Sequence, residues 1–169
     1  MTRLFLPFTL ALSLSACTSD PLTGPLEPRI GRDECAECGM LISDGACASA
    51  LLIEQNGSAG QGDGGGGRGV KESVVFDDIG CMLDYLPKTK GAHVEHFVRD
   101  HAQRRWVAGS TAWIVAASGL HTPMGSGMVA FADRAAADRL AHESGGRVFP
   151  GASLLEAPAT ARTLPPSAK

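Results

Sequence analysis

The sequence predicts an α+β fold made of two small, similar ββαβ lobes. Phe76 is followed two residues later by Asp78, and Phe131 is followed two residues later by Asp133, so one short pattern recurs at a spacing of 55 residues. In both places valine precedes the phenylalanine, which favours a strand, and a helix-forming stretch follows the aspartate. This period is too long for a solenoid, and short strands combined with one helix are typical of a small α+β lobe. We therefore expect two lobes that arose by internal duplication.

The first predicted lobe, residues 34–91, begins with two strands. The apolar runs 48–53 and 73–76 predict these strands. Between them, residues 57–69 are mostly glycine and have almost no side chain to bury, so they cannot offset the entropy lost on ordering. We expect a flexible hairpin loop there. A phosphate-binding loop would end in Lys followed by Ser or Thr, which this stretch lacks.

The helix of this lobe should begin after Asp77 and Asp78, because aspartate is a favourable N-cap. The apolar residues that follow recur at helical spacing: Ile79, Met82, Leu83 and Leu86. Pro87 should end the helix. Met82 lies on the apolar stripe and is expected in the core, whereas Cys81 projects away from that stripe, toward another element or solvent.

The second predicted lobe, residues 92–157, repeats this order. Its expected strands are 93–98, parts of 106–115, and 127–131. A helix-forming stretch, 134–141, follows them and should end near Gly145. Met128 alternates with Ala130 in the last of these strands, so we expect its flexible side chain to fill the core.

The first sixteen residues, 1–16, are predicted to be a secretory signal peptide. Arg3 supplies its positive start, an apolar run covers 4–14, and small residues precede Cys17. The segment Leu14-Ser15-Ala16-Cys17 resembles the cleavage box of bacterial lipoproteins. That resemblance implies that Cys17 is diacylated, becomes the new N-terminus and anchors the protein to a membrane. Thr18, in place of Asp, implies the outer membrane by the same resemblance. The alternative is a plain secreted protein in which Cys17 is incidental.

The segment next to the anchor, 17–33, is proline-rich and has few large apolar side chains, which is typical of an extended, flexible tether. The end of the chain, 158–169, is rich in Ala and Pro and is expected to be disordered. Beyond the signal peptide no run of about 18 apolar residues occurs, so we expect no other segment to span a bilayer.

The composition suits a folded protein with no nucleic-acid partner. Hydrophobic residues make up 44% of the chain and charged residues 20%, which is enough apolar material to bury a core. The formal net charge is -3, and no cluster of Lys and Arg alternates with aromatic residues. A nucleic-acid-binding surface is therefore not expected.

Three sulfur side chains occur within six residues, at Cys35, Cys38 and Met40. Gly39 permits backbone geometry that other residues resist, so the chain can turn and bring neighbouring sulfurs together. Thiolates and thioethers bind Cu(I), zinc and iron–sulfur clusters, and a thioether beside two thiols favours Cu(I).

A second candidate loop contains Met124, between Pro123 and Gly125. The fixed dihedral of proline and the freedom of glycine predict a turn with a thioether at its tip. His121 lies close by in the sequence and is a further candidate ligand, because imidazole binds copper and zinc. The alternative for Met124 is a partly exposed apolar side chain that fills a gap.

Four cysteines remain after Cys17, and disulfides have to be considered for all of them in an oxidising compartment. The pairings left open are Cys35 with Cys38 and Cys47 with Cys81. A disulfide through Cys38 would remove a metal ligand.

The sequence resembles NosL lipoproteins in three segments that stand in the same order: Cys38-Gly39-Met40, Phe76-Asp77-Asp78-Ile79-Gly80-Cys81-Met82-Leu83 and Thr122-Pro123-Met124-Gly125-Ser126-Gly127. The resemblance covers most of the mature chain. It implies two similar ββαβ lobes and a periplasmic copper chaperone, not an enzyme, that serves the maturation of nitrous oxide reductase. The implied partners are the nitrous oxide reductase apo-enzyme and its ABC-transporter-type maturation complex, contacted directly or indirectly.

The same resemblance implies a Cu(I) site built from Cys38 and Met124, with Met40 near it and Cys35 as a further contributor. The chain departs from the usual pattern in its glycine-rich insertion and in carrying Cys47. Neither departure removes a matched position.

Two other functions use Cys35 and Cys38. A thiol–disulfide oxidoreductase could cycle this pair, but such motifs usually open a helix, and Gly39 is a poor helix residue. A structural zinc module would need two later ligands, and the sequence has no second close pair at the usual spacing.

Overall fold

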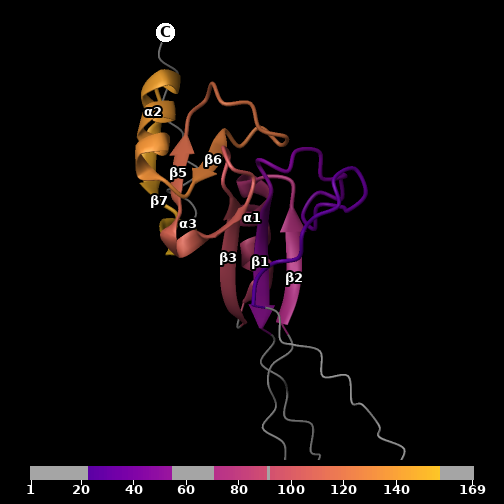
Figure 1. Cartoon of the computed structure of the whole chain (residues 1–169). Coiled ribbons are helices and arrows are strands. Elements are labelled where there is room, and N and C mark those ends of the chain that lie inside the picture. The colour runs from indigo at the N-terminus through magenta and orange to yellow at the C-terminus, as the bar shows by residue number, and fades with distance from the viewer. Residues whose placement is uncertain (1–22, 55–70, 91, 157–169) are drawn as a thin grey trace, which may run out of the picture.

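Two antiparallel sheets, each covered by a helix, make up the part of the chain that the computed structural model describes, residues 23–54, 71–90 and 92–156 (Figure 1). The predicted signal peptide, the lipid site Cys17, the glycine-rich loop 57–69 and the tail 158–169 lie outside the described residues.

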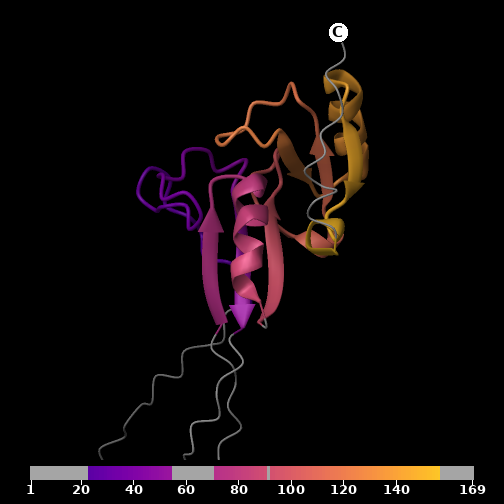
Figure 2. The ribbon, with the colours of Figure 1, turned by 180° about the vertical axis from the view of Figure 1, so that it is seen from behind.

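The first sheet has four strands in the order β2-β1-β3-β4. Their bounds are Ser49–Glu54 for β1, Lys71–Phe76 for β2, His93–Arg99 for β3 and Trp106–Ala108 for β4. Helix α1, Ile79–Tyr85, lies across one face of this sheet (Figure 2), and the short 3-10 helix η1, Leu86–Thr89, follows it.

The second sheet has three strands in the order β6-β5-β7. Their bounds are Trp113–Ala116 for β5, Met128–Phe131 for β6 and Arg147–Pro150 for β7. Helix α2, Arg134–Ser144, packs on this sheet. The 3-10 helix η2, Gly109–Thr111, precedes β5, and the short helix α3, Ser153–Glu156, follows β7.

The predicted α+β mixture of helices and strands is confirmed, and both sheets are antiparallel. In each sheet the first strand is central, the second and third strands flank it, and the helix comes between the second and the third. A duplication would produce this shared order, and the duplication itself stays a prediction.

The predicted boundary between the lobes, after residue 91, is wrong. Strand β3, which the prediction places in the second lobe, pairs with β1 over residues 93–98, from Ser49 opposite Val98 to Glu54 opposite His93. Strand β4 then pairs with β3. Alternating side chains identify a strand but not its partner, and β1 needs a partner on each side.

The predicted tether, 17–33, is also corrected in its described part. The Leu26 amide donates to the Ser73 hydroxyl at 2.9 Å. The guanidinium of Arg99 contacts both carboxylate oxygens of Glu27, at 2.6 and 2.8 Å. Residues 23–33 are therefore fastened to the first sheet, because polar side chains supply contacts that the proline content did not predict.

Both helix starts agree with the sequence. The Asp78 carboxylate accepts a hydrogen bond from the amide of Cys81 at the start of α1, and Asp133 caps α2 in the same way. Helix α1 ends at Tyr85, before Pro87, and α2 ends at Ser144, where its C-cap Gly145 has a φ of 63° in the left-handed region that glycine favours.

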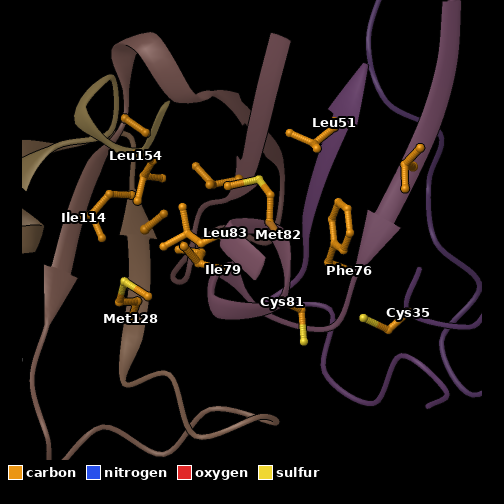
Figure 3. Close-up of a cluster of buried hydrophobic side chains, with 14 of the residues drawn as sticks. Cys35, Leu51, Phe76, Ile79, Cys81, Met82, Leu83, Ile114, Met128 and Leu154 are labelled. Atoms are coloured by element: carbon orange, nitrogen blue, oxygen red, sulfur yellow. The ribbon is translucent and has the colours of Figure 1, made fainter. Parts of the chain in front are cut away.

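The main core is shared between the two sheets. Figure 3 shows Phe76 and Met82 from the first half of the chain in one buried cluster with Ile114, Met128 and Leu154 from the second half. Met82 and Met128 are buried, as predicted. The sheets are thus parts of one hydrophobic unit.

The imidazole of His96, on β3, packs between Gly109, which follows β4, and Gly151, which follows β7. Its Nε2 lies 2.9 Å from the Gly151 carbonyl oxygen, and since a carbonyl only accepts, Nε2 carries the proton. Burial lowers the pKa of His96, which keeps the ring neutral. A Cβ added at Gly109 would lie 1.8 Å from Nε2, so the ring fits there only against glycine.

We therefore expect Gly109→Ala to lower the free energy of unfolding by about 1–3 kcal/mol, because the added methyl group must displace a buried, hydrogen-bonded ring. Urea denaturation measures this change. Gly119→Ala is the matched control, since a Cβ at Gly119 meets no atom within 4 Å. Equal stability of the two variants would contradict the close packing of His96 on Gly109.

Candidate metal centre

Three of the predicted site residues, Cys35, Cys38 and Met40, lie on a tight hairpin, residues 34–41, here called the cysteine hairpin. Its ends are joined by a bridge between Glu34 and Leu41. Within it, the Cys35 amide donates to the Met40 carbonyl and the Gly39 amide donates to the Cys35 carbonyl, both at 2.8 Å. Gly39 has a φ of +73°, which glycine adopts without strain. The turn therefore returns the chain so that Cys35 and Cys38 share one side.

A third cysteine joins this pair from helix α1. The Sγ atoms of Cys35, Cys38 and Cys81 all lie within 4.8 Å of one another. Cys35 and Cys81 are buried at the edge of the core, where Figure 3 shows them near each other, while Cys38 is exposed. Among the described residues, these three side chains form a group that could hold a metal ion.

The protein environment shifts the pKa values of Cys35 and Cys81 in opposite directions. Burial opposes ionisation of Cys35, but hydrogen bonds from the amides of Cys38, Asp77 and Glu37 outweigh it and lower the pKa of this thiol. Burial and the nearby Cys35 raise the pKa of Cys81. A bound cation would reverse this effect on Cys81, because coordination favours the thiolate.

Met124 reaches the same place from the second half of the chain. It lies in the loop 122–127, here called the methionine loop, where Gly125 and Gly127 have φ values of 70° and 63°. Figures 1 and 2 both show the segment before β6 extending over the end of the first sheet toward the N-terminal segment. Met124 is 38% exposed.

Cys38, Cys81 and Met124 line one cleft of about 490 Å³, here called the sulfur cleft. Its other lining residues are Glu37, Asp78, Gly80, Asp84, Gly125, Ser126 and Met128. The cleft therefore opens between α1, the cysteine hairpin and the methionine loop, and sulfur atoms enter it from each of these three elements.

The predicted site residues are only partly brought together. Cys35 and Cys38 lie in the sulfur cluster and Met124 lines the cleft beside it. Met40 is 57% exposed and does not line the cleft. Its backbone carbonyl accepts the hydrogen bond from the Cys35 amide that closes the cysteine hairpin. His121 is exposed and also lies outside the cleft lining.

Sequence reasoning did not assign Cys81 as a ligand. The sequence does contain an indication of this role, because a polarizable thiol placed off the apolar stripe of a helix can contact another element. What the periodicity could not give was that this other element is the cysteine hairpin.

None of the four cysteines within the described residues forms a disulfide. Cys81 lies beside Cys35, whereas Cys47 packs in a separate buried cluster with its thiol 3.8 Å from the Asp44 carboxylate. The predicted alternative of a Cys47–Cys81 pair is therefore wrong. Burial and Asp44 together raise the pKa of Cys47 to about 12.

The family model for NosL matches residues 29–156, a segment that holds both sheets, the cysteine hairpin and the methionine loop. The chain belongs to the NosL family. This confirms the resemblance that the three sequence segments indicated.

The fold agrees with a solved NosL structure. The crystal structure of the copper chaperone NosL from Shewanella denitrificans superposes with a TM-score of 0.54 at 18% sequence identity, over 74% of this chain and 93% of that chain. No curated protein matches the sequence. Within the described residues, no helix is both long and apolar enough to cross a membrane.

The thiols of the folded, reduced protein should differ in reactivity. We expect iodoacetamide at pH 8 to modify Cys38 first, because it is exposed, and to leave Cys47 unmodified, because a thiol with a pKa of about 12 has almost no thiolate at that pH. Mass spectrometry of quenched samples gives the order, with protein in guanidinium as the control in which Cys35, Cys38, Cys47 and Cys81 all react. Early labelling of Cys47 in the folded protein would contradict this environment.

Proposed function

We propose that this protein is a periplasmic Cu(I)-binding lipoprotein that carries copper for the maturation of nitrous oxide reductase. The observation that carries the proposal is a cluster of three thiols in a NosL-family protein, two of which, Cys38 and Cys81, line one cleft together with Met124. The matched Shewanella denitrificans protein is described as a copper chaperone, which supports the same cargo here.

The sulfur cluster has dimensions that suit a metal ion. An ion about 2.3 Å from three sulfurs in a plane separates those sulfurs by about 4 Å. The three Sγ atoms, already within 4.8 Å of one another, need only small rotations to reach that arrangement. We assign Cys35, Cys38 and Cys81 as thiolate ligands and Met124 as the thioether ligand. Cys35 is included because it belongs to the cysteine cluster, whereas Met40 and His121 are left out because neither lines the cleft.

The ligand types favour Cu(I) over other ions. Thiolate and thioether sulfurs are soft donors, and a thioether in the set favours Cu(I) over zinc. The carboxylates of the cleft would attract a cation in general, but Asp78 already accepts hydrogen bonds through both of its oxygens. Selection for copper then rests on sulfur.

Release of copper needs a ligand that a partner can replace. Cys38 and Met124 are exposed at the cleft, whereas Cys35 and Cys81 are buried. A partner can therefore approach from the exposed pair and take over the ion step by step. We propose that the recipient is the nitrous oxide reductase apo-enzyme or its ABC-transporter-type maturation complex.

We further propose that the two ββαβ arrangements arose by duplication, which is supported by their shared strand order. The copper site then lies where the two copies meet. The cysteines come from the first copy and the segment before it, and Met124 comes from the second.

A zinc site is the second candidate, and the third thiol favours it. Three cysteines and one further ligand are a common zinc set, and Cys81 supplies one of the two later ligands that such a site needs. A thiol–disulfide oxidoreductase has less support. Cys35 and Cys38 lie on a hairpin and not at a helix start, and the thiol with the lowered pKa, Cys35, is buried.

Competition titration of the reduced protein without residues 1–17 separates copper from zinc. We expect one Cu(I) per chain, bound more tightly than zinc. Met124→Leu keeps the apolar bulk and should weaken Cu(I) binding about tenfold or more without changing the fold, because a soft ligand is lost. Met82→Leu is the matched control, since Met82 is buried in the core, does not line the cleft and should affect stability alone. Preference for zinc, or unchanged Cu(I) affinity in Met124→Leu, would contradict the proposed site.

The lipid anchor is tested separately. We expect Cys17→Ala to leave the full-length protein without acyl chains and free in the periplasmic fraction, because the proposed anchor rests on that thiol. Fractionation with a membrane marker measures this, and density-gradient separation of the unmodified protein tests the proposed outer-membrane location. Retention of Cys17→Ala in the membrane would exclude Cys17 as the sole anchor.

A further inference from the structure

The carboxylate of Asp78 connects the two parts of the sulfur cleft. Its Oδ1 accepts a hydrogen bond from the Cys81 amide at 3.0 Å. Its Oδ2 accepts from the Thr122 hydroxyl at 3.1 Å, from the Met124 amide at 3.2 Å and from the Ser126 amide at 3.4 Å. Asp78 itself is fully buried. One oxygen therefore holds the helix that carries Cys81, and the other holds the loop that carries Met124.

The contacts inside the methionine loop lead back to the same carboxylate. The Thr122 hydroxyl accepts from the Gly127 amide, and the Ser126 hydroxyl accepts from the Met128 amide. Thr122 and Ser126 also lie 3.2 Å apart through their hydroxyl oxygens. Both residues bind Asp78, so the loop is closed around one fixed acceptor.

Helix α1 approaches the loop closely at the next residue. A Cβ added at Gly80 would lie 2.7 Å from the Ser126 Cβ, closer than side chains pack. Asp78 and Gly80 thus bring α1 and the methionine loop together, one by hydrogen bonds and the other by the absence of a side chain.

We propose that Asp78 is a positioning residue for the metal, which sets the separation between the Met124 thioether and the Cys81 thiolate without binding the ion itself. This inference rests on the proposed function of the sulfur cleft. Both carboxylate oxygens accept hydrogen bonds from N–H and O–H donors, so they orient the segments that carry Cys81 and Met124. Groups of this kind hold ligands in place, and their loss costs about 10–100-fold in metal affinity.

A helix N-cap alone does not account for these contacts. Asp133, the N-cap of α2, directs both oxygens to its own helix, at the amides of Ala135 and Ala136. Asp78 gives its own helix one oxygen and gives the other to a loop more than 40 residues later. The comparison separates capping from positioning and supplies a matched control.

Asp78→Asn tests the proposal. Asparagine caps helices as well as aspartate does, so its oxygen can keep the Cys81 bond, but its NH₂ group then faces the amides of Met124 and Ser126, which only donate. We expect Cu(I) affinity to fall about tenfold or more. Asp133→Asn should leave it unchanged. Should Asp78→Asn fail to fold, Thr122→Val removes a single donor and is expected to weaken binding in the same direction by a smaller factor.

Combining Asp78→Asn with Met124→Leu shows the route of the effect. If Asp78 acts through Met124, Asp78→Asn should change the affinity little in the Met124→Leu background. X-ray absorption at the copper edge should also show one sulfur neighbour fewer in Asp78→Asn alone. An equal additional loss in that background, or wild-type affinity in Asp78→Asn, would overturn the positioning role.

These outcomes also separate the inference from the proposed function. Wild-type affinity in Met124→Leu removes Met124 from the site and overturns both. A weakened Met124→Leu beside an unaffected Asp78→Asn keeps the copper site and overturns the positioning role alone.

Discussion

The buried carboxylate of Asp78 is the constraint on which the candidate site depends. A charged group without solvent is costly unless donors surround it, and no single element of this fold supplies enough of them. The Cys81 amide comes from α1, and the remaining donors come from the methionine loop. Satisfying the charge therefore requires the two halves of the chain to meet, and the sulfur cleft forms where they do.

Two further buried carboxylates follow the same rule. Asp77 accepts hydrogen bonds from the amide and the hydroxyl of Ser43, which holds the segment after the cysteine hairpin. Asp100, at the end of β3, accepts from the Ala132 amide at 2.7 Å, directly after β6. Each buried carboxylate thus accepts hydrogen bonds from a distant backbone segment, and the shared core packs between the segments held in this way.

The sequence predicted what depends on local pattern. Apolar spacing placed the helix after Asp78 and the core positions of Met82 and Met128, because these features need only a neighbour a few residues away. The remaining features depend on contacts between segments far apart in the sequence, which no periodicity encodes. They are the partner of β3, the contact between Cys81 and the cysteine hairpin, and the attachment of residues 23–33. The residues around Met124 predicted a turn with a thioether at its tip, and the resemblance to NosL then implied that this thioether is a copper ligand.

The unequal exposure of the sulfurs gives the proposed copper transfer a direction. Cys35 and Cys81 are buried against the core, so they present far less surface to a partner than the exposed sulfurs do. Cys38 ends a tight turn and Met124 lies in a glycine-containing loop, and both are exposed. In the proposed site, their bonds to copper would therefore be the first that an incoming ligand could replace. Since a thioether is neutral, Met124 would leave without separating charge, while the remaining thiolates would hold the ion until the partner's own ligands were in place.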